Sequence, residues 1–240
     1  MIISQSRRFI FIHIHKAGGT SVEFGLAPYL AWNDIILGST PLGEAINIPY
    51  NAQYRLNKHS SIGDLERVCG AETIVGYYVF SVVRHPLDRL CSLYNFVGSI
   101  ISRWAISQGI SPNDVQDYLK KNPDALKKAS ELTWPASRAF IGTSDFSSFI
   151  RDNNLVWEIG YHTQVSRLKN SVDGTLGGTI FRLEDRSKWI PELRKTLGVE
   201  FSLPHKNSSE LKLATRDMVS IEDKNYIEEY YAEDYAAFGY

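Results

Sequence analysis

The stretch that decides the fold is Phe9-Ile10-Phe11-Ile12-His13-Ile14-His15-Lys16-Ala17-Gly18-Gly19-Thr20-Ser21. Residues 9–14 are a short and nearly continuous apolar run, which is typical of a strand covered on both faces in a parallel sheet. A glycine-rich turn follows, and we expect a helix from Val22. A strand, a glycine loop and a helix in this order can bind a phosphate group at the helix N-terminus.

The same alternation of strand and helix recurs along the chain. Apolar runs at 77–83 and 179–183 predict two more strands, and a capping pattern at Ser61 predicts a short helix. Further helices are expected at 86–104, 111–119, 124–132, 146–153, 187–197 and 220–237. The pattern favours an α/β fold with a central, mainly parallel sheet flanked by helices. We expect a single domain over 1–240, with an irregular excursion at 31–57 and a helical insertion at about 105–160.

Composition excludes several classes of protein. The chain has 240 residues, 43% hydrophobic and 12% aromatic, with a formal net charge of −1. Disorder is excluded because the apolar content can offset the ordering entropy, and bulk charge argues against a nucleic-acid partner. No secretory signal is visible, and the longest apolar stretch, 74–83, is too short to span a membrane. Cys69 and Cys91 are expected to be two buried reduced thiols, so we expect a cytoplasmic protein.

Two segments carry the chemistry. In the first, the backbone amides of Gly18 to Ser21, the hydroxyls of Thr20 and Ser21 and the ammonium of Lys16 can converge on an anion at the start of the helix. Lys16 precedes the glycines, so this is not the pattern of a mononucleotide-binding loop. In the second segment Arg84 ends a strand and Ser92 follows eight residues later. An arginine fork and a hydroxyl suit a second phosphate.

Together these segments resemble the sulfotransferase superfamily, most closely the branch that contains the uronosyl 2-O-sulfotransferases and their bacterial relatives. Its members have a Pro-Lys-Thr-Gly-Gly-Thr-Ser-like loop for the 5′-phosphosulfate and a strand-end Arg with a Ser eight residues on for the 3′-phosphate. The supporting stretches are 58–60, 181–185, 203–207, 230–235 and 238–240. His15 and Ala17 depart from the family's Pro and Thr.

The resemblance implies a nucleotide-binding, P-loop-like sulfotransferase fold. The implied reaction moves a sulfuryl group from 3′-phosphoadenosine 5′-phosphosulfate to an acceptor hydroxyl. Residues 16–21 (Lys16, Ala17, Gly18, Gly19, Thr20, Ser21), Arg84 and Ser92 would bind this donor, and Lys16 would stabilise the leaving oxygen. No metal is needed for this chemistry. The acceptor is expected to be a glycan, a lipid-linked sugar or a small hydroxylated metabolite.

A hydroxyl acceptor needs a base, and His59 is the first candidate. Lys58 and the helix start at Ser61 favour the neutral imidazole, which can accept a proton. In the resembling enzymes a His between the two phosphate motifs has this role. Glu184 and His15 stay open as alternatives. His162 and His205 are weaker candidates, and His13 is expected to be packed in the strand.

Two other functions compete with sulfuryl transfer. A nucleotide-dependent phosphotransferase would need Mg²⁺ ligands, such as a Ser or Thr directly after the loop lysine and an Asp at a strand end. Ala17 and Arg84 occupy these positions, which disfavours this alternative. The other alternative is a module that binds an anion without chemistry. The loop lysine together with a candidate base argues against it.

Overall fold

The computed structural model describes residues 1–204 and 211–240. Their Cα positions divide into two compact units. The sheet unit comprises the described residues of 1–85, 163–204 and 233–240, and the helical unit those of 86–162 and 211–232. The sheet unit is thus built from three separate segments of the chain. The expectation of a single domain over 1–240 stays a prediction.

The sheet unit contains a five-stranded sheet in the order β3-β1-β2-β4-β5. The predicted apolar runs form β2 (Phe9–Ile12), β4 (Tyr78–Val83) and β5 (Thr179–Arg182), and these three strands are parallel. Two short strands that the sequence analysis missed, β1 (Ile2–Ser4) and β3 (Ile35–Ile36), extend the sheet in antiparallel fashion. The α/β class with a mainly parallel sheet is therefore confirmed.

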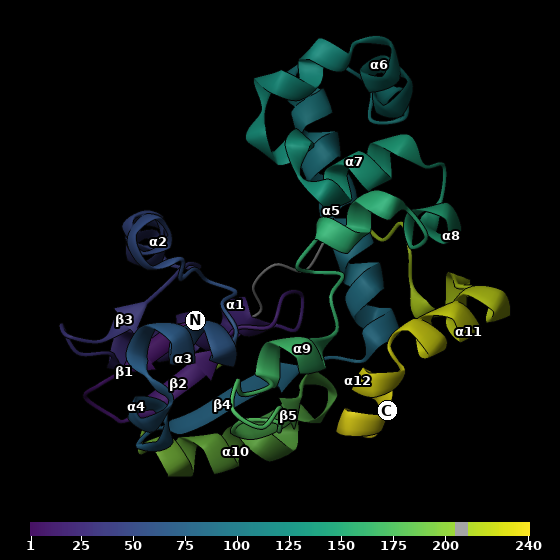
Figure 1. The fold of residues 1–240 in the computed structure, drawn as a ribbon. Coiled ribbons are helices and arrows are strands. Elements are labelled where there is room, and N and C mark those ends of the chain that lie inside the picture. Colours follow the sequence, from purple (N-terminus) through teal and green to yellow (C-terminus); the bar gives the residue numbers. More distant parts are fainter. Residues whose placement is uncertain (205–210) are drawn as a thin grey trace. The chain divides into compact units, whose positions relative to one another are not determined.

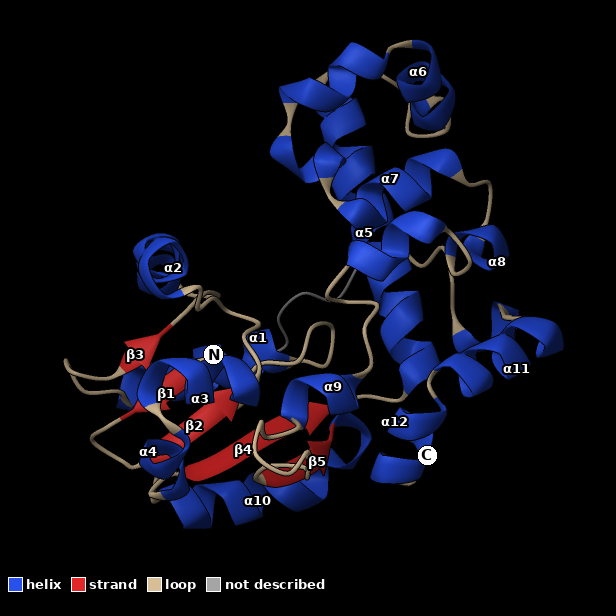
Figure 2. Cartoon of the chain, in the orientation of Figure 1, coloured by secondary structure: helices blue, strands red, loops and turns tan. Residues whose placement is uncertain are grey.

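Helices cover both faces of this sheet (Figures 1 and 2). Ile10 and Ile12 of β2 join one hydrophobic cluster with residues of α3 (Ile62–Cys69), α4 (Ala71–Val75) and α9 (Gln164–Leu168). Phe9 and Phe11 point the other way and join a cluster with α1 (Gly19–Leu26) and α10 (Arg186–Leu197). Burial on both faces explains why β2 reads as an unbroken apolar run.

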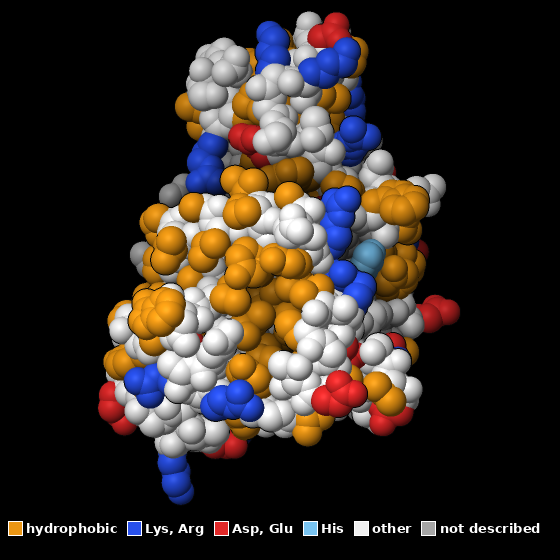
Figure 3. Space-filling view, turned by 60° about the vertical axis from the view of Figure 1, so that its left-hand side comes forward, with side chains coloured by type: hydrophobic (Ala, Val, Ile, Leu, Met, Phe, Trp, Pro, Cys, Tyr) orange, Lys and Arg blue, Asp and Glu red, His pale blue; other side chains and the backbone are white. Residues whose placement is uncertain are grey.

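The excursion at 31–57 is not irregular throughout, which corrects the expectation. Residues 41–54 form the 14-residue helix α2 (Pro41–Tyr54). Thr40 caps it by accepting a hydrogen bond from the amide of Gly43 at 3.0 Å, and Pro41 occupies the first position. Pro49 lies inside the helix, where a proline ordinarily disfavours helical structure. Leu42 and Ile48 remain 68% and 72% exposed. Figure 3 shows many hydrophobic side chains, in orange, on the face of the molecule that it presents.

The helical unit is built on α5 (Pro86–Ser107), a helix of 22 residues. Six of its apolar and aromatic residues recur at helical spacing and are buried: Leu87, Leu90, Tyr94, Val97, Ile101 and Trp104. The Tyr94 ring packs against Phe140 and Phe149, with centroids 4.9 and 5.0 Å apart. Because α5 belongs to this unit, the helical part begins at Pro86 rather than near residue 105.

The rest of the helical unit consists of shorter helices. They are α6 (Val115–Lys121), α7 (Pro135–Gly142), α8 (Phe146–Phe149), α11 (Ile221–Tyr230) and the 3₁₀ helices η2 (Pro123–Lys128), η3 (Ser130–Thr133), η4 (Asn153–Trp157) and η6 (Arg216–Met218). The helix expected over 124–132 is therefore two 3₁₀ segments. In the part of the chain that the structure describes, no helix has the length and apolar character needed to cross a membrane.

Three details complete the sheet unit. The 3₁₀ helices η1 (Ala27–Tyr29) and η5 (Leu183–Asp185) follow α1 and β5. The helix expected over 220–237 is interrupted at Tyr231, and its second part is α12 (Ala232–Phe238), which lies in the sheet unit from Glu233 onward. Cys69 ends α3 and is exposed, whereas Cys91 is buried, so only one of the two thiols fits the expectation.

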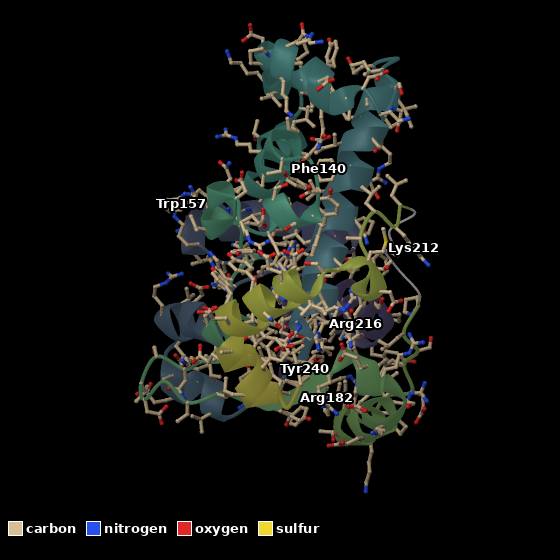
Figure 4. All side chains as sticks on the ribbon, turned by 90° about the vertical axis from the view of Figure 1, so that its right-hand side faces the viewer. Phe140, Trp157, Arg182, Lys212, Arg216 and Tyr240 are labelled. Atoms are coloured by element: carbon tan, nitrogen blue, oxygen red, sulfur yellow. The ribbon has the colours of Figure 1, made fainter. Side chains whose placement is uncertain are left out.

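The C-terminal segment is attached to the end of β5. The guanidinium of Arg182 donates to the backbone carbonyl of Gly239 at 2.9 Å, and it lies 5.7 Å from the centre of the Tyr240 ring. Figure 4 labels Arg182 and Tyr240 beside each other. Arg182 also donates twice to Asp185, at 2.8 and 2.6 Å, which fixes the guanidinium for this contact.

Candidate active site

The glycine loop joins β2 to α1 through an unusual backbone. Lys16 has φ 63° and Gly18 has φ 82°, both in the left-handed region. Gly18 is the N-cap of α1 and has no side chain to cap the first turn. Gly19 is needed for a different reason, because a Cβ there would lie 2.2 Å from Cδ2 of His13. The two glycines therefore let the loop turn sharply over His13 at the N-terminus of α1.

The other predicted loop residues follow from this path. Thr20 and Ser21 lie half-buried in the first turn of α1, and their part in binding an anion stays a prediction. Ala17 is fully buried, and its methyl group belongs to the hydrophobic cluster around Ile10 and Ile12. Residue 17 can therefore offer a ligand its backbone but not its side chain.

Lys16 lies in a strongly positive environment. Its pKa is lowered to about 7, first by burial and then by the neighbouring charges of Arg84 and Lys58. A lysine is normally charged far above neutral pH, so this loop disfavours its own ammonium. An anion bound beside Lys16 would reverse that penalty. The charge balance is what a site for a phosphate or sulfate group requires.

Arg84 joins the second predicted segment to the loop. It directly follows β4, which lies beside β2 in the sheet. Its Nη1 donates to the backbone carbonyl of Lys16 at 3.4 Å. The structure therefore brings Lys16 and Arg84 together, at the carboxyl edge of the parallel strands, where ligands bind in open α/β sheets. Ser92 lies in α5 of the helical unit and is half-buried, so its part in the site stays a prediction.

His59 lies in the turn before α3, between two other histidines. Its ring centre is 4.7 Å from that of His13 and 4.7 Å from that of His15. Its Nδ1 lies 3.1 Å from the backbone carbonyl of His13, and Arg167 donates to the carbonyl of His59 at 2.6 Å. Since a carbonyl only accepts, Nδ1 carries the proton and Nε2 is left with its lone pair. Nε2 is therefore the atom of His59 that can act as a base.

The pKa of His59 supports this assignment. Burial, followed by the nearby His15 and His13, lowers it well below the ordinary value of 6.5. The ring is therefore neutral at physiological pH, as a proton acceptor must be. Lys58 and the helix start predicted this neutral state, whereas its main causes are burial and the two neighbouring histidines.

His13 has a structural partner, as the sequence predicts for a packed residue. It is buried, and its Nδ1 is 2.8 Å from Oε1 of Glu23, which is itself fully buried on α1. Burial would raise the pKa of Glu23, but His13 and the amino group of Met1 hold it well below its usual range. Burial lowers the pKa of His13 despite this carboxylate. The pair anchors the strand end beneath the loop.

The remaining candidates for the base have other partners. Glu184 accepts from the amide of His85 at 2.9 Å and from the hydroxyl of Tyr240 at 3.1 Å. His162 lies in the helical unit, where its Nε2 is 2.9 Å from the carbonyl of Val156. His205 lies outside the described residues. His15 lies beside His59 and stays open as a second titratable group.

Two residues at the site were missed by the sequence analysis. Gln164 is fully buried and binds both backbone groups of Arg84: its Oε1 accepts from the amide at 2.9 Å and its Nε2 donates to the carbonyl at 2.8 Å. Asp234, also fully buried, accepts from the amides of Gln164 and Val165 at 2.9 Å each. The sequence signal for Asp234 was only its place in the C-terminal stretch that supports the resemblance.

The histidines that the structure describes belong to no group of three or more side chains that could hold a metal ion. Within residues 1–204 and 211–240, no three His, Cys, Asp or Glu side chains are grouped to hold a metal ion. The positive charge near the loop comes from side chains of the chain itself, Lys16, Lys58 and Arg84.

Comparison with known proteins identifies the family. Searches of the curated proteins and of the solved structures give no match. A family model described as "Sulfotransferase family" matches residues 1–240. That match spans both units and includes the loop of Lys16 and the strand end of Arg84. The chain belongs to the sulfotransferase family, whose members are enzymes that transfer a sulfuryl group to an acceptor.

Proposed function

We propose that this sulfotransferase moves the sulfuryl group of 3′-phosphoadenosine 5′-phosphosulfate to a hydroxyl group of a carbohydrate or glycoconjugate. The observation that carries the proposal is the contact between Arg84 and the carbonyl of Lys16 at 3.4 Å. This contact supports the proposal because it joins, at one edge of the sheet, the two segments that we propose to bind anions. A nucleotide with phosphate groups on both its 3′ and 5′ oxygens has two anionic ends for these segments to bind.

The loop residues fit the 5′-phosphosulfate end of this donor. The left-handed Gly18 and the close approach of Gly19 to His13 keep side chains away from the start of α1. Backbone amides, the hydroxyls of Thr20 and Ser21 and the ammonium of Lys16 would then bind the anion. Arg84, with Ser92, would bind the 3′-phosphate. Arginine suits that role because its planar fork matches phosphate oxygens.

The donor supplies an activated sulfuryl group, and the residues of the chain supply orientation and charge. His59 Nε2 accepts the proton of the acceptor hydroxyl as the oxygen of that hydroxyl forms a bond to sulfur. Lys16 stabilises the negative charge that develops on the bridging oxygen as the bond from sulfur to that oxygen breaks. Adenosine 3′,5′-bisphosphate leaves with the electron pair of that bond. No charge has to come from a metal ion in this scheme.

The proposed acceptor class follows from the charge of the chain. The overall charge of −1 favours a small or mid-sized glycan, a lipid-linked sugar or a hydroxylated metabolite over a long polyanion. The cytoplasm remains the proposed location, and the two free thiols are compatible with a reducing compartment.

Thermal unfolding with different nucleotides tests the donor. Adenosine 3′,5′-bisphosphate should stabilise the protein by about 2.7 kcal/mol at a concentration of about 100 Kd. ATP with Mg²⁺ should stabilise it far less. The reverse order would support a phosphotransferase, and stabilisation by neither nucleotide would contradict the proposed donor site.

Turnover separates an enzyme from a binding module. Radiolabelled donor is incubated with a panel of sugars, glycolipids and small alcohols, and transfer of label is measured. Lys16→Ala serves as the inactive control, because one well-placed hydrogen-bond donor that stabilises developing charge contributes about 10²–10³ in rate. The binding module would be favoured if the protein binds adenosine 3′,5′-bisphosphate but transfers no label to any acceptor class and does not slowly hydrolyse the sulfuryl donor.

A further inference from the structure

We propose that Gln164 and Asp234 are positioning residues that set the affinity for the donor's 3′-phosphate by fixing the backbone of Arg84. This inference rests on the proposed function, which makes Arg84 the ligand of that phosphate. Neither residue is expected to touch the donor. Their action would pass entirely through Arg84.

The first step is the position of Arg84 relative to the sheet. The ladder between β4 and β5 ends with the pair Val83 and Arg182. Arg84 is the next residue, and there the side chain of Gln164 takes the place of a neighbouring strand. One amide accepts from the N–H of Arg84 at 2.9 Å and donates to its C=O at 2.8 Å. Both backbone groups of one residue are therefore paired with a single planar side chain.

The second step is the orientation of that amide. The Nε2 of Gln164 lies 2.8 Å from the carbonyl of Arg84 and 3.2 Å from Oδ2 of Asp234. Both neighbours are acceptors, so the nitrogen must occupy this position and the oxygen must face the amide of Arg84. A flipped amide would place its oxygen against two acceptors. Asp234 therefore selects the one orientation of Gln164 that pairs correctly with Arg84.

The third step is the cost of burying Asp234. Its side chain is fully buried, and it receives the amides of Gln164 and Val165 at 2.9 Å each besides the Gln164 side chain. A buried carboxylate is expensive unless it is well bonded. Here that carboxylate is used to hold α9 and the Gln164 side chain. The adjacent Tyr235 ring also packs edge-on against His85, the residue after Arg84, with centroids 5.3 Å apart.

The consequence is specific to one end of the ligand. We call the side chains of Gln164 and Asp234 the clamp of Arg84. Without this clamp, the backbone of Arg84 could rotate, and its guanidinium would lose the fixed direction that a bidentate phosphate contact needs. The loop of Lys16 and Gly18 receives one long hydrogen bond from Arg84, at 3.4 Å, and is otherwise held by its left-handed turn and by the packing of Gly19 on His13. Loss of these Gln164 and Asp234 contacts should therefore weaken binding of the 3′-phosphate far more than binding of the 5′ end.

The test compares two nucleotides that differ only at the 3′ position. Dissociation constants of adenosine 3′,5′-bisphosphate and adenosine 5′-phosphate are measured for wild type, Gln164→Glu and Asp234→Asn. Gln164→Glu keeps the shape and removes the donor. The matched control is Asp223→Asn, which alters a carboxylate of the helical unit that is 5% exposed and accepts from Ser147 at 2.8 Å.

We expect both clamp variants to bind the bisphosphate at least about tenfold more weakly, which is the scale of one charge-assisted hydrogen bond. Binding of adenosine 5′-phosphate should change by less than about twofold, and Asp223→Asn should alter neither constant. In an Arg84→Ala background, Gln164→Glu should cause no further loss, because both changes act on the same contact.

Equal losses for both nucleotides, or additive losses in the Arg84→Ala background, would overturn the inference. If Asp234→Asn shows no cooperative thermal unfolding, Gln164→Glu decides alone. Failure of the proposed function gives a different result: wild type itself would not bind the bisphosphate, or Arg84→Ala would bind it as wild type does. Either of these results would overturn the clamp as well.

Discussion

Raising the pH from about 7 to about 9 should weaken the binding of adenosine 3′,5′-bisphosphate, because Lys16 loses its proton over this range. The free enzyme has a Lys16 pKa of about 7, lowered by burial and by Arg84 and Lys58. A bound anion favours the charged ammonium and returns the pKa toward its ordinary value near 10.4. Binding affinity is therefore greatest below the free pKa and falls as the pH rises between the free and the bound values.

The size of the effect follows from these two pKa values. At a pH of about 7, half of the free enzyme carries the charge on Lys16, and at a pH of about 9 only about one molecule in a hundred does. Ligand binding must then include protonation of Lys16, so the dissociation constant rises by roughly 50-fold. A lysine with the ordinary pKa would give almost no change. Phosphate groups of the ligand titrate near a pH of about 6, below this range.

Calorimetric titration of the bisphosphate at several pH values measures this change, with Lys16→Arg as the matched control. The guanidinium of that variant stays charged throughout, so its dissociation constant should be flat. Thermal unfolding at each pH checks that the fold is intact. A wild-type constant that changes less than about twofold would refute the lowered pKa. If the dissociation constant rises equally with pH in wild type and in Lys16→Arg, the titrating group is not Lys16.

Three further outcomes follow from the site. In wild type, at saturating donor, the rate should rise with pH in the acid range, because the pKa of His59 lies well below 6.5. His59→Ala should lower turnover and remove this rise. An unchanged pH profile in the variant would move the role of base to His15 or Glu184. Arg84→Ala and Ser92→Ala should both weaken binding of the bisphosphate, with the larger loss for Arg84 because its contact is charge-assisted, and unchanged affinity in both variants would remove this pair from the donor site. Gly19→Ala should destabilise the fold by about 1–3 kcal/mol in thermal unfolding, because its Cβ would overlap with His13. The control Gly63→Ala should not, since its Cβ would meet its nearest atom at 3.8 Å. Equal destabilisation by the two variants would contradict the overlap.

Local patterns were enough to predict the parallel part of the sheet. Strand β2 is buried throughout and β4 is buried from Phe80 to Val83, so each reads as an apolar run without knowledge of its neighbours. Strand β5 lies at the edge of the sheet with only Phe181 buried, and its short apolar run after a glycine-rich turn was still enough to predict it. The short β1 and β3 carry too little sequence for such a pattern and depend on pairing with each other. Helix α2 was missed because Pro49 disfavours a helix, although Thr40 and Pro41 begin it well.

Within the candidate site, the local motifs could be predicted from the sequence, and the contacts between distant residues could not. The loop from Lys16 to Ser21 and the strand end at Arg84 are contiguous motifs, so their residue types and order were visible in the sequence. The contact of Gln164 with Arg84 joins residues 80 positions apart, and that of Asp234 with Gln164 joins residues 70 apart. No local pattern encodes such pairs. The proton on Nδ1 of His59 likewise depends on the carbonyl of His13, 46 residues away.

The segmented construction of the sheet unit has a consequence for biosynthesis. Arg84 leaves the ribosome 150 residues before Asp234, with nearly all of the helical unit between them. At about 5–20 residues per second, that interval lasts roughly 8–30 s. During this time the nascent chain already has its glycine loop and Arg84, but the buried carboxylate that orients Gln164 has not yet been made. The proposed donor site can therefore reach its final geometry only after residues 233–240 have been synthesised and have joined the sheet unit.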